Sequence, residues 1–205
     1  MMKNRLRVIF KWLYNDFKWP LLILIPVVAC LINFLAHQDF LGWSANNVLK
    51  SKLEIIHPAL LAGFALVSLM GWRMYSSAAL GGMAWLGFAF VMREIHFEGS
   101  DYLMGVIVVI VLGSAWRSPE RYVDLWNSDW VVSLLFMGFV SYFCSEILLD
   151  RGLIKQPFEL LYGDPDWKLP FSTQMEESLE TLGGLFLFLS GLIFFRAKRK
   201  YENRE

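Results

Sequence analysis

Six long apolar stretches dominate this sequence, and each is close to the length that a helix needs to cross a membrane. They occupy residues 19–37, 57–75, 77–95, 102–117, 129–149 and 177–196. A hydrocarbon core about 30 Å thick requires ~20 residues of α-helix. Lipid offers the backbone no hydrogen-bond partner, so such segments are expected to be helical. The sequence therefore predicts an all-α fold, a polytopic transmembrane helical bundle with about six spans.

The composition agrees with this class. Hydrophobic residues make up 56% of the 205 residues, and the mean hydropathy of +0.44 is higher than a soluble domain of this size needs. The formal net charge is zero, so bulk charge gives no reason to expect a nucleic-acid partner. The expected partners are the lipid bilayer and other membrane proteins. Cys30 and Cys144 lie in apolar stretches, where we expect buried thiols.

Lysine and arginine gather on one side of the predicted bundle. That side holds 13 of the 19 basic residues, namely Lys3, Arg5, Arg7, Lys11, Lys18, Arg73, Arg117, Arg121, Arg196, Lys198, Arg199, Lys200 and Arg204. The other side holds Lys50, Lys52, Arg93, Arg151, Lys155 and Lys168. By the positive-inside rule the richer side is cytoplasmic. Because the number of spans is even, both termini are expected in the cytoplasm.

Three regions follow from this topology. Residues 1–18 alternate basic and apolar positions at helical spacing, which predicts an amphipathic helix on the cytoplasmic leaflet. Residues 19–197 form the transmembrane domain, with an outer loop over 151–176 that either covers the helix ends or lies in the headgroup layer. Residues 198–205 form a basic cytoplasmic tail. Within the domain, the small pairs Ala59/Gly63 and Ala78/Gly82 predict close helix packing in one protomer.

Three pairs of carboxylates stand four residues apart beside apolar stretches: Glu94/Glu98, Glu146/Asp150 and Glu176/Glu180. Like charges one helical turn apart repel by roughly 0.2–0.5 kcal/mol, and an ionised acid within lipid costs roughly 2.5–3.5 kcal/mol. Cations, protons or basic residues must therefore compensate them. The predicted topology places all three pairs at the periplasmic ends of the spans.

Histidines and an arginine share that layer, so the sequence predicts one polar cluster there. The candidate metal ligands are Glu94, His96, Glu98, Glu146 and Glu180, and the wider polar cluster adds His57, Arg93, Asp101, Asp150, Glu176 and Glu177. Carboxylate and imidazole ligands suit a divalent metal such as zinc, iron or manganese. Two alternatives remain open. Arg93 and Arg151 could neutralise the acids without a metal, and His57 before Pro58 could be a helix N-cap.

Two short segments carry a family resemblance. They resemble segments of uncharacterised multi-pass bacterial inner-membrane proteins. The first segment is Arg93-Glu94-Ile95-His96-Phe97, and the second is Glu176-Glu177-Ser178-Leu179-Glu180. The resemblance implies a bacterial inner (plasma) membrane location and joint use of the two segments. It implies no activity.

Three functions fit these patterns. The first is a subunit or scaffold of a membrane complex, in which the acids pair with basic residues. The second is a metal-dependent membrane hydrolase acting at the outer leaflet, and the third is a cation or proton transporter. The predicted cytoplasmic half offers mainly the hydroxyls of Ser68, Ser114, Ser133 and Ser190, which disfavours a pathway through the bundle.

Overall fold

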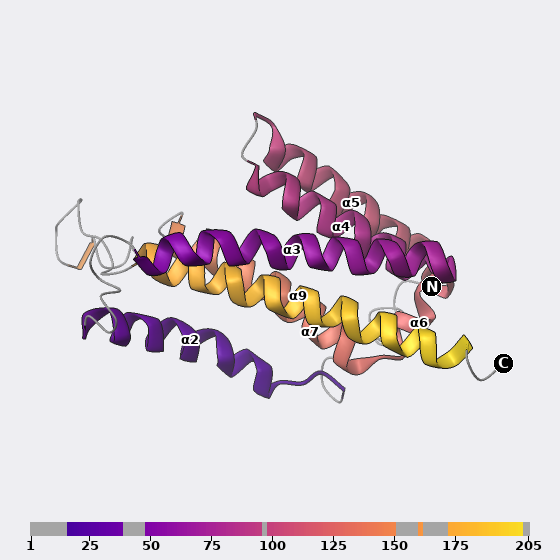
Figure 1. Cartoon of the computed structure of the whole chain (residues 1–205), viewed down its shortest axis with the longest axis horizontal. Helices are drawn as coiled ribbons and strands as arrows, with labels where there is room; N and C mark the ends of the chain where they lie inside the picture. Colours follow the sequence, from indigo (N-terminus) through magenta and orange to yellow (C-terminus); the bar gives the residue numbers. More distant parts are fainter. Residues whose placement is uncertain (1–15, 39–47, 96–97, 151–159, 162–171, 203–205) are drawn as a thin grey trace.

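The computed structural model describes residues 16–38, 48–95, 98–150, 160–161 and 172–202, and the elements within these ranges are all helical (Figure 1). The elements are α2 (Pro20–His37), α3 (Val48–Tyr75), α4 (Ala78–Glu94), α5 (Ser100–Arg117), η2 (Pro119–Tyr122), α6 (Val123–Trp126), α7 (Asp129–Phe143), η3 (Cys144–Asp150) and α9 (Ser172–Glu202). The all-α prediction is confirmed.

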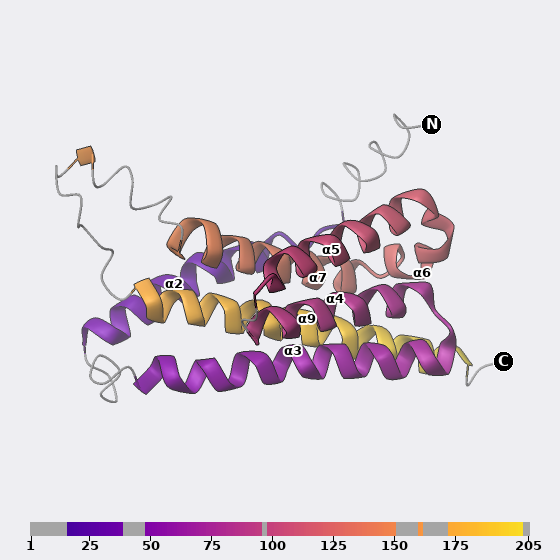
Figure 2. The same cartoon turned by 90° about the horizontal axis from the view of Figure 1, so that it is seen from above.

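The bundle is organised around two long helices, α3 and α9, which lie side by side along their whole length in both views (Figures 1 and 2). α4 packs on α3 after a tight turn, and α5 packs on α4. α7 packs along α9, and α2 packs on α9 on the side away from α3. This arrangement brings the start of α3, the end of α4, the end of α7 and the start of α9 to one end of the bundle.

The helices meet the requirements for crossing a membrane to different degrees. Three helical segments are long and apolar enough to cross a membrane: Pro20–His37, Leu49–Tyr75 and Ser172–Glu202. A fourth candidate is the pair Tyr102–Arg117 and Pro119–Trp126, which is bent by 105°. α4 and α7 are shorter, at 17 and 15 residues. The structure thus supports three or four candidate spans, and neither the six predicted spans nor the orientation of the termini is confirmed.

α3 begins nine residues earlier than the apolar stretch that predicted it. Its first turns carry Lys50 and Glu54, which form an i,i+4 ion pair with the ammonium and carboxylate 3.4 Å apart. Such a pair stabilises a helix even though it lowers the hydropathy. His57 is therefore well inside α3 and Pro58 is a helix-interior proline. The interpretation of His57 as an N-cap is wrong.

Glycines allow the closest helix contacts. A Cβ placed on Gly87 of α4 would lie 2.8 Å from the Cα of Ala65 on α3, so the two backbones touch. The same closeness joins α7 and α9, because a Cβ on Gly183 would lie 3.1 Å from the carbonyl oxygen of Gly138. These backbone contacts are not at the predicted pairs, because Gly63 lies against the side chain of Phe188 and Gly82 against that of Val111. Small residues thus allow close helix packing within the chain, but at other positions than the sequence indicated.

Only parts of the three predicted regions lie within the residues that the structure describes. Most of the predicted interfacial helix over 1–18 and of the outer loop over 151–176 lies outside them. Phe17 is buried against Ile25 and Leu134. The backbone N–H of Lys18 donates to the hydroxyl oxygen of Ser133 over 3.2 Å. These contacts fix the start of α2 to α7, and α9 continues without a break through residues 198–202.

Candidate functional site

Polar side chains from different helices meet inside the bundle, at the end where α3 and α9 begin. We call this group the polar centre, and its members are His57, Arg93, Glu94, Tyr142, Glu146, Glu177 and Glu180. They come from α3, α4, α7, η3 and α9. Antiparallel neighbours return the chain to the same end, so residues far apart in the sequence become neighbours here.

His57 lies at the middle of the polar centre, with its side chain only 1% exposed. Its Nδ1 is 3.5 Å from a carboxylate oxygen of Glu94 and 3.6 Å from one of Glu180. Its Nε2 hydrogen-bonds to the hydroxyl of Tyr142. Both ring nitrogens of a buried imidazole thus face polar partners, as burial of a polar group requires.

A glycine pair on α9 makes room for these two rings. A Cβ on Gly183 would lie 2.8 Å from the ring of Tyr142, and a Cβ on Gly184 would lie 3.5 Å from the ring of His57. The Tyr142 ring also packs on Phe90 of α4, with centroids 4.7 Å apart. The sequence Gly183-Gly184 therefore lets α3 and α7 approach α9 closely enough for His57 and Tyr142 to meet.

Arg93 joins the carboxylates of the polar centre. Its guanidinium forms an ion pair with Glu146, and lies 3.8 Å from a carboxylate oxygen of Glu180 and 3.9 Å from one of Glu94. A guanidinium presents five N–H donors in a planar fork, so one arginine can contact several carboxylates. Arg93 thus ties α4 to η3 and to α9.

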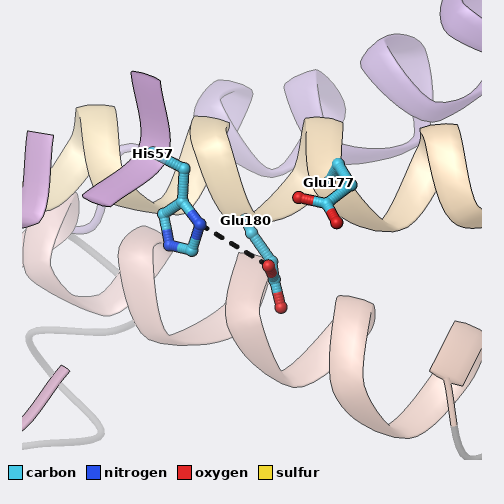
Figure 3. A group of neighbouring side chains, drawn as sticks. All are labelled: His57, Glu177 and Glu180. Atoms are coloured by element: carbon cyan, nitrogen blue, oxygen red, sulfur yellow. Dashed lines mark ion pairs between the residues drawn. The ribbon is translucent and has the colours of Figure 1, made fainter. Parts of the chain in front are cut away.

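His57, Glu177 and Glu180 form a group of side chains that could hold a metal ion (Figure 3). One ligand atom from each lies within 4.8 Å of the others. Glu177 and Glu180 are three residues apart on α9 and so share a helix face. Figure 3 shows the imidazole of His57 reaching from α3 toward the Glu180 carboxylate. Imidazole and carboxylate groups are common ligands of zinc, manganese and iron.

The exposure of the side chains increases from one side of the polar centre to the other. It is 1% for His57, 10% for Glu180, 13% for Arg93, 15% for Glu94 and 25% for Glu146. The centre is therefore closed around His57 and opens toward Glu146. A small polar molecule or an ion would approach from the side of η3.

The structure brings some of the predicted site residues together and separates others. Glu94, Glu146 and Glu180 meet with Arg93 and His57, and Glu177 joins them. Glu176 is half-buried one residue away, and its carbonyl oxygen accepts a hydrogen bond from Ser145 over 3.2 Å. His96 and the side chains of Asp101 and Asp150 lie outside the described residues.

Glu98 differs from the expectation for a physical reason. Its pairing with Glu94 assumed a continuous helix, in which residues four apart share a face. α4 ends at Glu94, and Glu98 is exposed in the turn before Gly99, whose φ of 89° only glycine adopts easily. The turn therefore takes Glu98 to the surface while Glu94 stays in the polar centre.

Tyr142 is the member of the polar centre that sequence reasoning missed. A tyrosine in an apolar stretch resembles an interfacial anchor, and nothing in the composition of α7 marks it. The available signal was its position four residues before Glu146, which places both near one helix face.

No protein-family model, curated protein or solved structure matches the chain. The chemistry of the polar centre is therefore the basis for a functional proposal.

Proposed function

We propose that this chain is an integral membrane protein that binds a divalent metal ion through His57, Glu177 and Glu180. The observation that carries the proposal is the mutual distance of at most 4.8 Å between their ligand atoms. Ligand atoms bound at ~2.0–2.2 Å to one ion lie roughly 3–4 Å apart. Small side-chain rotations would therefore close the group around a metal ion.

The charge of the polar centre supports a cation. Arg93 brings one positive charge to the carboxylates of Glu94, Glu146 and Glu180, and Glu177 adds a fourth acid next to His57. Even with a protonated imidazole, two positive charges stand against four carboxylates. Unbalanced charge in a poorly solvated site is costly. A divalent ion would balance it, and so would protons on the acids.

The number of protein ligands favours a reactive ion over a purely structural one. Catalytic zinc sites commonly have three protein ligands and an open position for water, whereas structural sites have four. His57, Glu177 and Glu180 supply three. Arg93, 3.8 Å from Glu180, could bind an anionic group beside the ion. This favours a metal-dependent hydrolase acting at the membrane surface on the side where η3 opens the centre.

A transporter fits less well, because the polar centre lies at one end of the bundle. Beyond Leu61 the α3–α9 contact is mainly apolar, and among the residues described it includes Phe64, Ser68, Leu187 and Gly191. Side chains of this kind give a cation no set of ligands to pass to. The expected bacterial inner membrane location and periplasmic side belong to this proposal and depend on the Lys/Arg asymmetry.

The contacts of Arg93 favour a second candidate, a subunit or scaffold of a membrane complex. In that role Arg93 would hold α4, η3 and α9 together, and the remaining negative charge would be balanced by protons or by a partner's basic residues. The two candidates differ in one measurable property. Only the first requires a bound metal ion.

Metal content separates them. The protein would be purified in mild detergent, stripped with a chelator, and titrated with zinc and manganese by calorimetry and elemental analysis. We expect about one ion per chain. Loss of an outer-shell partner typically weakens a metal site 10–100-fold, so loss of a ligand in Glu177→Gln or Glu180→Gln should cost at least tenfold.

Glu98→Gln is the matched control, because it removes the same charge from the exposed turn next to the centre. It should bind metal like the parent protein. Absence of any metal binding by the parent, with unchanged melting temperature after chelation, would refute the metal proposal and leave the scaffold.

A further inference from the structure

A cavity of about 470 Å³ lies at the opposite end of the bundle from the polar centre. It is a partly open cavity between the last residue of α3, the link between α6 and α7, and the last turns of α9, near the labels α6 and C in Figure 1. Its lining includes Tyr75, Asp124, Asn127, Phe194, Lys198 and Glu202. Cavities of ~300–1,000 Å³ are typical of small-molecule sites.

The charged groups of this cavity carry both signs. The Lys198 ammonium forms an ion pair with the Asp124 carboxylate, and Glu202 follows Lys198 by one turn of α9 on the same lining. An ammonium has three N–H donors, so Lys198 can keep Asp124 and still donate to another anion. One ammonium and two carboxylates complement a ligand that has an anionic and a cationic group close together.

Tyr75 is one of the residues that line the cavity, and its ring packs against Phe195 with centroids 5.8 Å apart. Its hydroxyl oxygen is buried, and no residue that the structure describes forms a hydrogen bond with it. Buried polar groups are rarely left without a partner, because desolvation is costly. Recognition of a ligand by this cavity rests on the charged groups of the lining.

The surroundings of the cavity have the character of a headgroup layer. Trp72, Trp126 and Trp130 are exposed at this end of the bundle, at 41%, 41% and 55%. Exposed tryptophans concentrate at the depth of lipid headgroups in membrane proteins. A cavity at that depth meets the headgroups of lipids.

We infer that this cavity binds a phosphate–ammonium zwitterion, which a membrane supplies as the headgroup of an ethanolamine phospholipid. Lys198 donates to the phosphate oxygens, and Asp124 and Glu202 accept from the primary ammonium. A primary ammonium offers three N–H donors to these carboxylates, and a choline group offers none. The inference is independent of the metal proposal, because the two sites lie at opposite ends of the bundle.

Binding of short-chain lipids to the full chain in detergent tests the inference. Dihexanoyl phosphatidylethanolamine, phosphatidylcholine and phosphatidylglycerol would be compared by calorimetry, with free phosphoethanolamine as a soluble form of the same chemistry. We expect the ethanolamine lipid to bind at least about tenfold more tightly than the other two lipids, because each lacks one set of charge-assisted hydrogen bonds. If free phosphoethanolamine binds as tightly as the ethanolamine lipid, the cavity recognises the phosphate–ammonium zwitterion, and the soluble molecule rather than the lipid is its ligand.

One variant and a matched control locate the site. K198Q should weaken binding of the ethanolamine lipid by about tenfold or more. K200Q removes the same charge from an exposed position two residues away and should leave the affinity unchanged. Exposed ion pairs contribute little to stability, so K198Q should melt like the parent protein. Equal affinity for all three lipids, or equal losses in K198Q and K200Q, would overturn the inference.

Discussion

The Nε2 of His57 and the hydroxyl of Tyr142 form a hydrogen bond that joins α3 to α7 in the polar centre. This bond turns the opposite nitrogen, Nδ1, toward the carboxylates of Glu94 and Glu180. A phenol hydroxyl can donate or accept, so it suits either tautomer of the imidazole. Tyr142 thus orients the His57 ring toward these carboxylates and, under the proposed function, would hold it in place as a metal ligand.

Replacing Tyr142 with Phe should weaken both stability and metal binding. The ring contacts with Phe90 and Gly183 remain, but one buried nitrogen of His57 loses its partner. We expect a loss of about 1–3 kcal/mol in unfolding free energy. Metal affinity should fall roughly 10–100-fold, as for other outer-shell partners. Denaturant unfolding in detergent and calorimetric titration measure the two effects.

Tyr102→Phe is the control for the loss of a hydroxyl, because Tyr102 is 82% exposed on α5. It should change stability by no more than about 0.5 kcal/mol. If Tyr142→Phe behaves in the same way, the hydrogen bond to His57 contributes nothing measurable.

Removal of Arg93 should destabilise the protein more than removal of its partner Glu146. Arg93→Gln leaves Glu94, Glu146 and Glu180 without their shared guanidinium, and breaking a buried pair typically costs about 3–5 kcal/mol. In Glu146→Gln the arginine keeps its other two carboxylates, and Glu146 is partly exposed, so we expect about 1–2 kcal/mol. Unfolding midpoints of both variants give the order.

Arg73→Gln provides the comparison, since Arg73 is exposed in the last turn of α3. It should unfold like the parent protein. If Glu146→Gln lowers the free energy of unfolding as much as Arg93→Gln does, the contacts of Arg93 with Glu94 and Glu180 contribute nothing measurable to stability.

Gly87→Ala should separate α3 from α4. The new Cβ would lie 2.8 Å from the Cα of Ala65, and a backbone atom cannot turn aside as a side chain can. Overpacking of this kind typically costs about 1–3 kcal/mol. In contrast, Gly105→Ala on α5 meets nothing within 4 Å and should raise stability by up to about 1 kcal/mol through helix propensity. Thermal unfolding of both variants measures the difference. Equal melting temperatures for Gly87→Ala and Gly105→Ala would contradict the close contact between α3 and α4.

The orientation of the helices remains a prediction from the Lys/Arg asymmetry, and reporter fusions test it. Fusions after Ser100 should report the periplasm, whereas fusions after Ser118 and Glu205 should report the cytoplasm. The two ends of α5 would then lie on opposite sides of the membrane. A cytoplasmic signal after Ser100 would place the polar centre on the cytoplasmic side of the membrane and contradict the predicted topology.

The sequence could predict which residues share an end of the bundle, because apolar stretches that alternate in direction return the chain to the same side. That reasoning brought Glu94, Glu146 and Glu180 to one level with Arg93. It could not predict where helices begin and end. Hydropathy began the second span at His57, but α3 begins at Val48 and includes charged residues in its first turns. The pairing of Glu94 with Glu98 assumed a continuous helix, but α4 ends at Glu94.

The sequence also could not predict which face of a helix turns inward. Both Glu176 and Glu177 were predicted members of the cluster, but the i,i+4 spacing pointed to Glu176 as the partner of Glu180. Instead, Glu177 is the residue that groups with Glu180 and His57. The choice depends on how α9 rotates against α3, which the close approach at Gly184 determines. The rotation of α9 about its own axis depends on how several helices pack together, so it cannot be predicted from the residue pattern of α9 alone.

The π-helical turns of η3 make the polar centre sensitive to the length of the chain. In these turns each N–H bonds to the carbonyl group five residues back, so each hydrogen-bonded ring encloses one residue more than in an α-helix. Ser145 is the residue between Cys144 and Glu146. We expect its deletion to convert this segment into an ordinary α-helix, which would change the position of the Glu146 carboxylate relative to Arg93. The ion pair between Arg93 and Glu146 thus depends on the number of residues in η3 as well as on their identity.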